Sequence, residues 1–264
     1  FTIGAACLCM TAVTANATYA ATKSGNGVYS LSTYENDSYD RADVTGDGRP
    51  DKIETAVTET NGTKKAALKV NGKQLKTWTL SKNNATVILP SVSVVVLSKK
   101  AAYLEIATED YRSNKTACAL YQVKNGKLRA AFDYEKMING KLLLDNDFVY
   151  KGYGYDMATA AKVSKNTIHL NVSLGTKSLG QIRTEGLKLK YSGGKLTLQK
   201  DAGKIANVNI ESDRGISRTF TAARKIQTVK TAGSSKKGIV LPKKTKFTAK
   251  KLAVIGKNIY VQVQ

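Results

Sequence analysis

Short β-prone segments separated by Asn-Gly pairs dominate the first half of the chain and limit the folds open to it. Residues 52–60, 64–70 and 74–80 are rich in β-prone residues, and Asn61-Gly62 and Asn71-Gly72 separate them. An Asn-Gly pair between such runs is the strongest short-range hairpin signal, because both residues tolerate positive φ. The three segments therefore predict an antiparallel meander.

The same arrangement recurs further along the chain. Residues 103–110, 115–123 and 128–134 form a second set, with Asn125-Gly126 between the last two. Asn71-Gly72 in the first set and Asn125-Gly126 in the second set are 54 residues apart. The two sets begin at residues 52 and 103, which are 51 residues apart. A period of about 50 residues with three or four strands is typical of propeller blades.

Later segments continue the β pattern. We expect strands at 167–173, 182–191 and 195–199, with a turn at residues 192–194, and a short helix only in the alanine-rich stretch 155–163. The predicted fold class is all-β, with propeller-like antiparallel β-meander repeats and a small C-terminal β-barrel-like module. The domain prediction is a signal peptide at 1–22, the β-repeat region at 23–215 and the module at 216–264.

Residues 1–22 carry no charge and end in small residues, as the apolar core and cleavage region of a secretory signal peptide do. The start at Phe1, without a basic leading segment, favours a sequence that is incomplete at its N-terminus. A buried strand or helix is the alternative interpretation. Cys118 would be the one cysteine after this segment, and we expect it to be a core thiol. No later apolar run is long enough to span a bilayer, so we expect no transmembrane anchor in the mature chain.

One loop carries the pattern of a calcium site. Oxygen-bearing side chains occur at the first, third, fifth, ninth and twelfth residues of the stretch 43–54, and Gly48 permits a sharp turn. Ca²⁺ takes six to eight oxygen ligands, and this spacing brings them toward one point. The candidate ligands are Asp43, Thr45, Asp47, the carbonyl of Arg49, Asp51 and Glu54. Thr45 departs from the usual Asp or Asn and should weaken binding, and an Asp/Gly-rich turn that binds nothing is the alternative.

A strand, and not a helix, is expected after this loop, which therefore resembles the calcium loops of FG-GAP or VCBS-type repeats. The resemblance covers about residues 40–134, and the second repeat has no carboxylates at the matching position, Ser98–Ala102. In those families the repeats form propellers in extracellular binding and adhesion proteins, and the calcium is structural. The resemblance implies the same for this chain.

Basic residues exceed acidic residues by 22, and the excess is concentrated at the C-terminal end. Residues 216–264 contain 12 Lys or Arg and no Asp or Glu. Of the 42 basic residues, 34 are lysines. Lysine favours diffuse attraction to polyanions, whereas specific recognition of nucleic-acid bases or phosphates favours arginine. For an exported protein we expect no nucleic-acid partner. A Gram-positive cell-wall polymer, an anionic lipid or an acidic glycan is the expected partner, and a merely solubilising face is the alternative.

The C-terminal segment also resembles the bacterial Src homology 3-like barrel that targets cell walls. The resemblance rests on residues 230–238, on Leu241-Pro242-Lys243-Lys244-Thr245 and on residues 258–263. Tyr260 stands where the family has Trp, and Lys244 where it has Gly. The resemblance implies attachment to the cell envelope.

Signals for catalysis are sparse. His169, the only histidine, lies in a β-prone segment and is expected to be structural, and no nucleophile-elbow, zincin or P-loop motif occurs. We therefore favour a secreted, monomeric, non-enzymatic binding protein. The competing interpretation is an extracellular carbohydrate-active enzyme that uses Asp145 and Asp147. Tyr150, Tyr153 and Tyr155 are the candidate ligand-binding residues, because tyrosines stack on sugars, or they fill half-buried sheet faces.

Overall fold

The fold is all-β, as predicted, and is built from antiparallel sheets. The computed structural model describes residues 25–98, 101–110, 115–137, 157–176, 180–209, 218–256 and 258–264. Every strand pair found in these residues is antiparallel. They also contain one four-residue helix, α1 (Tyr134–Met137). None of their helices is long and apolar enough to cross a membrane.

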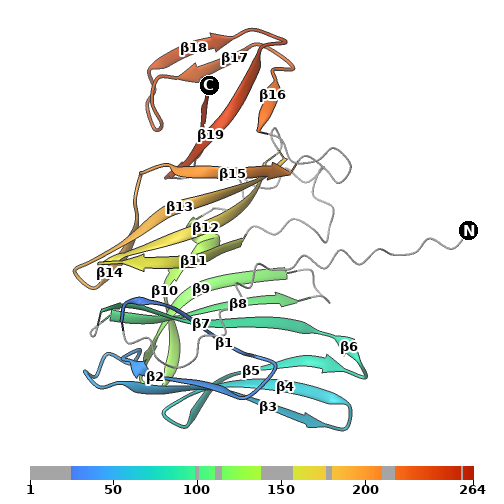
Figure 1. The fold of residues 1–264 in the computed structure, drawn as a ribbon, viewed down its shortest axis with the longest axis vertical. Helices are drawn as coiled ribbons and strands as arrows, with labels where there is room; N and C mark the ends of the chain where they lie inside the picture. Colours follow the sequence, from blue (N-terminus) through green and yellow to red (C-terminus); the bar gives the residue numbers. More distant parts are fainter. Residues whose placement is uncertain are drawn as a thin grey trace, which may run out of the picture.

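Three sheets lie one above another, and a two-stranded ribbon lies at one end of the molecule (Figure 1). The first sheet contains β2 (Asp37–Ala42), β3 (Asp51–Thr60), β4 (Thr63–Val70), β5 (Lys73–Lys82) and β6 (Ala85–Thr86). The central sheet contains β1 (Gly27–Leu31), β7 (Ile88–Ser98), β8 (Ala101–Asp110), β9 (Lys115–Lys124) and β10 (Lys127–Asp133). The third sheet contains β11 (Met157–Ser164), β12 (Thr167–Thr176), β13 (Gly180–Ser192), β14 (Lys195–Leu198), β15 (Gly203–Asn209), β16 (Thr219–Thr221), β19 (Lys246–Ile255) and β20 (Asn258–Val263). The ribbon contains β17 (Ile226–Val229) and β18 (Lys237–Leu241).

The Asn-Gly hairpins are confirmed. Asn61-Gly62 joins β3 to β4, Asn71-Gly72 joins β4 to β5, and Asn125-Gly126 joins β9 to β10. In all three pairs both residues have positive φ, between 48° and 76°, which matches the twist of the flanking strands. The two predicted meanders are therefore present, one in the first sheet and one in the central sheet.

Residues 92–97 of β7 are buried without alternation because the central sheet is covered on both faces. Val92, Val94 and Val96 pack toward the first sheet, in a cluster with Ile53, Leu68 and Trp78 of that sheet. Val95 and Leu97 pack toward the third sheet, in a cluster with Ile168, Leu170 and Leu187. Each fully buried aliphatic side chain of this kind contributes about 1.5–3 kcal/mol. These two cores hold the three sheets together.

The helix expected in the alanine-rich stretch 155–163 is wrong, because its described part forms β11. This strand pairs with β12 along its length, with a bulge between Ala160 and Lys162. Ala160 is buried in the core between the central and third sheets. Alanine's helix propensity is worth only tenths of a kcal/mol over most residues, and pairing with an apolar strand outweighs it.

The C-terminal segment shares its longest strand with the third sheet. The beginning of β19 pairs with β16, and its later residues pair with β15 and β20. Ala249, Leu252 and Val254 of β19 are buried in the large core, whereas Phe247 belongs to a small core with Ala222 and Leu241. The boundary expected at Ile216 lies outside the described residues, and β19 runs continuously through both cores.

Candidate functional site

The acidic loop, defined here as residues 43–51, connects β2 to β3 and is organised around the Asp43 carboxylate. Asp43 is buried, and its oxygens accept hydrogen bonds from the N–H groups of Gly46, Asp47 (3.2 Å) and Gly48 (2.8 Å). The Thr45 hydroxyl also donates to Asp43, at 3.3 Å. Gly46 and Gly48 have φ of 78° and 90°, which glycine adopts without the Cβ clash of other residues. The loop backbone therefore folds around the first predicted ligand.

Asp51, at the start of β3, is the second organising carboxylate and is only 1% exposed. One oxygen accepts from the N–H groups of Val44 (2.7 Å) and Thr45 (2.9 Å). The other accepts from the Thr45 hydroxyl (3.1 Å) and the side-chain amide of Asn71 (2.7 Å). The structure thus brings together Asp43, Thr45 and Asp51, with the Thr45 hydroxyl between the two carboxylates.

The other predicted ligands lie further from this centre. Asp47 and Arg49 are exposed, and an Asp47 carboxylate oxygen accepts the Arg49 N–H at 2.8 Å. Glu54 lies three residues beyond Asp51 in an extended strand, so the two side chains point to opposite faces of the first sheet. Glu54 forms an ion pair with Lys52 at 2.8 Å.

The acidic loop also attaches the first sheet to the central sheet. The carbonyl of Val44 accepts the N–H of Val123 at 3.0 Å, and the Val44 side chain is buried in the core between the two sheets. The Lys124 ammonium donates to the Thr45 carbonyl at 3.2 Å. A cation from β9 therefore contacts the backbone of the acidic loop.

The donor chemistry of this loop fits calcium, since it offers hard carboxylate and hydroxyl oxygens within one turn. In the conformation described, Asp43 and Asp51 each accept three N–H hydrogen bonds, and the single proton of the Thr45 hydroxyl lies between them. No group of three His, Cys, Asp or Glu side chains converges within the described ranges. An ion would therefore have to replace hydrogen bonds to these carboxylates, such as those from the Thr45 hydroxyl, whose oxygen would then be available as a ligand.

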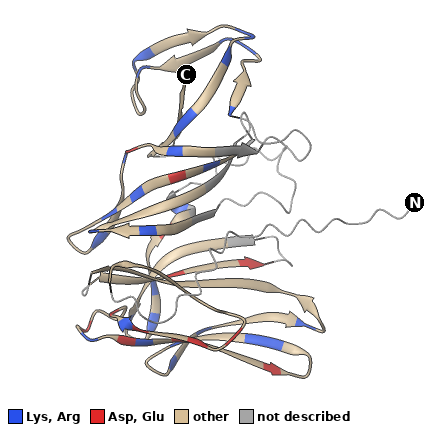
Figure 2. Cartoon of the chain, in the orientation of Figure 1, with Lys and Arg blue, Asp and Glu red and all other residues tan. Residues whose placement is uncertain are grey.

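Basic side chains of the C-terminal segment are exposed and have no ion-pair partner in the part of the chain that is described. They are Arg218, Arg224, Lys225, Lys230, Lys236, Lys237, Lys243, Lys244, Lys246, Lys250 and Lys251. Figure 2 shows these cations near the ribbon and on β19, with no acidic residue among them. Lys244 has a φ of 71° in a turn closed by the Thr245 N–H and the Pro242 carbonyl, a position that favours glycine.

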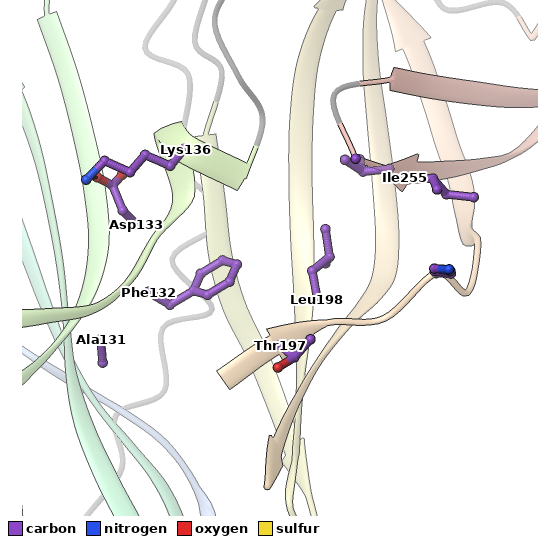
Figure 3. A pocket seen from close by; sticks show the side chains of 10 residues that line it. Ala131, Phe132, Asp133, Lys136, Thr197, Leu198 and Ile255 are labelled. Atoms are coloured by element: carbon purple, nitrogen blue, oxygen red, sulfur yellow. Dashed lines mark ion pairs between the residues drawn. The ribbon is translucent and has the colours of Figure 1, made fainter. Parts of the chain in front are cut away.

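The residues named for sugar stacking and for catalysis, Tyr150, Tyr153, Tyr155, Asp145 and Asp147, lie outside the described residues. A hollow of about 480 Å³ lies between β10 and α1 on one side and β14 and β19 on the other (Figure 3). Phe132, Leu198 and Ile255 provide its apolar lining, and Asp133 and Lys136 form an ion pair of 3.4 Å at its edge. Among the described residues that line the hollow, Asp133 is the only carboxylate, and it is paired with Lys136.

His169 has the features of a structural residue. Its Nε2 lies 2.7 Å from the Ser164 hydroxyl across the β11–β12 hairpin. Burial, with the charges of Lys162 and Lys188, lowers its pKa. The histidine is therefore neutral at pH 7 and fixes the end of a hairpin.

Glu105 is a buried titratable group that sequence reasoning missed. It lies on β8 and points into the core between the central and third sheets, where it is 6% exposed. One oxygen accepts from the Tyr134 hydroxyl at 2.8 Å and from the Ala160 N–H at 2.6 Å. Burial raises the pKa of Glu105 to about 7, and these two hydrogen bonds only partly oppose the rise. The sequence signal that could have identified Glu105 is its position as the one charged residue in the otherwise apolar run 101–107.

Comparisons with known proteins found no relative of this chain. Neither the protein-family models, nor the curated proteins, nor the solved structures give a match to the chain.

Proposed function

We propose that the chain is a secreted, non-enzymatic binding protein that attaches to an anionic polymer of a bacterial envelope through its C-terminal segment. The observation that carries this proposal is the segregation of charge: residues 216–264 hold 12 basic and no acidic side chains, whereas all 20 acidic residues precede them. Exposed lysines without acidic partners attract a polyanion, and no bidentate arginine chemistry is needed for that.

The stacked sheets act as the scaffold in this proposal. We propose that the repeats are propeller-like. Support comes from the stacking of the first and central sheets face to face and from the spacing of about 50 residues between their meanders, which is typical of propeller blades. The acidic loop is proposed to take a structural Ca²⁺ through Asp43, Thr45, Asp47 and Asp51. The ion would add positive charge at the contact between the first and central sheets.

Cosedimentation with purified Gram-positive walls tests the binding proposal. We expect retention at roughly 50 mM salt and its loss at roughly 300 mM, because salt screens attraction between exposed charges. Replacing Lys236, Lys237 and Lys243 with glutamine should abolish retention. The charge-matched control replaces Lys65, Lys76 and Lys82, which are exposed on the first sheet, and should be retained like the wild type. Equal behaviour of the two triple variants, or no retention of the wild type at low salt, contradicts the proposal.

Calorimetry and thermal unfolding test the calcium site. With a dissociation constant near 10⁻⁴ M, about 10 mM Ca²⁺ should add about 2.7 kcal/mol to the free energy of unfolding. Asp47→Ala should remove this gain with little change in EDTA, because the Asp47 side chain is exposed and accepts one hydrogen bond within the loop. Thr45→Asp should lower stability in EDTA through carboxylate repulsion and enlarge the response to Ca²⁺. No uptake by the wild type at several millimolar Ca²⁺ contradicts the site.

A further inference from the structure

The ribbon of β17 and β18 combines exposed aliphatic side chains with unpaired cations. The described residues expose four large apolar side chains, and three of them are on this ribbon: Val229 (41%), Ile239 (67%) and Val240 (41%). The ribbon pairs with no other strand in the described part of the chain. Such a concentration of exposed aliphatic residues at one place marks an interaction surface more often than scattered exposure does.

The ribbon is a firmly held element. Its base packs into the small core through Leu241 and Ile226. The Thr228 hydroxyl donates to the Ile239 carbonyl at 2.7 Å, and the Lys230 N–H donates to the Lys236 carbonyl at 2.9 Å. The aliphatic side chains are therefore presented on a preformed backbone.

Cations surround this apolar surface. Lys230, Lys236 and Lys237 lie where the two strands are joined, and Lys243 and Lys244 follow β18 directly. The ribbon lies at the end of the long axis of the molecule, away from the first and central sheets and with β18 as its outer strand (Figure 1), so the edge of β18 is free to approach a flat surface. No acidic residue of the segment opposes the approach to a negatively charged partner.

We propose that the ribbon is a membrane-surface contact that inserts the edge strand β18, with Ile239 on one face and Val240 on the other, among the headgroups of an anionic lipid bilayer, while the flanking lysines bind the headgroup charges. The inference builds on the proposed role of the C-terminal segment as the attachment end and names a partner for it. Lysines alone would serve a soluble polyanion, but such a partner would leave the aliphatic side chains in water. A lipid interface accepts both, since it takes apolar side chains below a charged layer.

Vesicle cosedimentation of the full chain tests this inference. The wild type should bind vesicles containing roughly 30% phosphatidylserine in phosphatidylcholine and should not bind pure phosphatidylcholine. The double variant Ile239→Ser with Val240→Ser should bind about tenfold more weakly, and Ile239→Leu should bind like the wild type. Both sites are exposed, so unchanged thermal unfolding serves as the folding control. Retention of the double variant on poly(glycerol phosphate) should equal that of the wild type, because its lysines are intact.

The outcomes separate this inference from the proposed function. Equal vesicle binding by the wild type and the double variant overturns insertion, as does binding to polyglutamate without binding to vesicles, which would indicate an acidic protein partner. Wall retention without vesicle binding overturns the lipid contact alone. Vesicle binding without wall retention overturns the polymer proposal and leaves the lipid contact standing.

Discussion

Glu105→Gln is expected to remove a pH dependence of stability that amounts to about 3 kcal/mol in the wild type. Burial raises the pKa of Glu105 from 4.5 to about 7 in the folded protein. Between these values the folded state holds a proton that the unfolded state releases. The free energy of unfolding therefore falls as the pH rises from about 4.5 to 7 and levels off above the folded pKa. Glutamine has the shape of the protonated side chain and does not titrate.

Urea unfolding at several pH values between 4.5 and 8.5 measures this effect. We expect the wild type to lose stability toward pH 8 and the Glu105→Gln variant to be the more stable protein there. Tyr134→Phe should move the midpoint of the loss to higher pH, because the Tyr134 hydroxyl donates to the carboxylate and favours its ionised form.

His169 is the control for this prediction, because its contribution has the opposite sign. Its pKa is lowered in the folded state, so its contribution to stability rises with pH below 6.5. His169→Gln should therefore steepen the loss of stability toward high pH. A wild type whose stability does not fall between pH 5 and 8, or a Glu105→Gln variant with the same slope, contradicts the assignment of the buried carboxylate.

Asp51→Ala is expected to destabilise the fold by about 3–5 kcal/mol, even with EDTA present. The variant removes a buried carboxylate that accepts three N–H hydrogen bonds, from the backbone of Val44 and Thr45 and from the Asn71 amide, and that lies 3.1 Å from the Thr45 hydroxyl. Those N–H groups would be left without an acceptor, at a cost of about 1–3 kcal/mol for each buried donor. Such a loss is a large part of the stability of an ordinary domain.

Asp47→Ala is the matched control, because it removes an exposed carboxylate of the same loop that accepts one backbone hydrogen bond. The Asp47→Ala variant should lower the free energy of unfolding by less than about 1 kcal/mol in EDTA. Urea unfolding of both variants in EDTA separates the role of Asp51 in the loop from any role in holding an ion. Similar losses for the two variants would show that the hydrogen bonds of Asp51 do not hold the loop.

Local sequence signals identified the hairpins because their information is contained in the turn itself. An Asn-Gly pair such as Asn61-Gly62 needs only the residues beside it to form a turn with two positive φ values. The helix expected in 155–163 was wrong because the deciding partner, β12, comes later in the chain. Local propensity is a weak signal where a neighbouring strand offers pairing and burial.

The acidic loop was located by its pattern, but its partners come from elsewhere in the chain. Asn71 was visible only as a turn residue, yet its amide reaches Asp51 from the β4–β5 hairpin at 2.7 Å. Lys124 reaches the loop from the central sheet, 79 residues further along the chain. The prediction placed Glu54 at the twelfth residue of the loop that begins at Asp43. It therefore required the chain to keep curving around the ion as far as Glu54. Here β3 begins at Asp51, and alternation along the strand turns Glu54 to the other face.

The strand β19 also determines how a mechanical load would travel through the protein. It runs without interruption from the small core beneath the ribbon into the large core beside the central sheet. A pull on the ribbon would therefore pass along one continuous strand. It would be resisted by the ladders to β15 and β20 along the strand. Load applied to the ribbon would therefore reach the third sheet through β19 itself, with no loop between the small core and the large core at this strand.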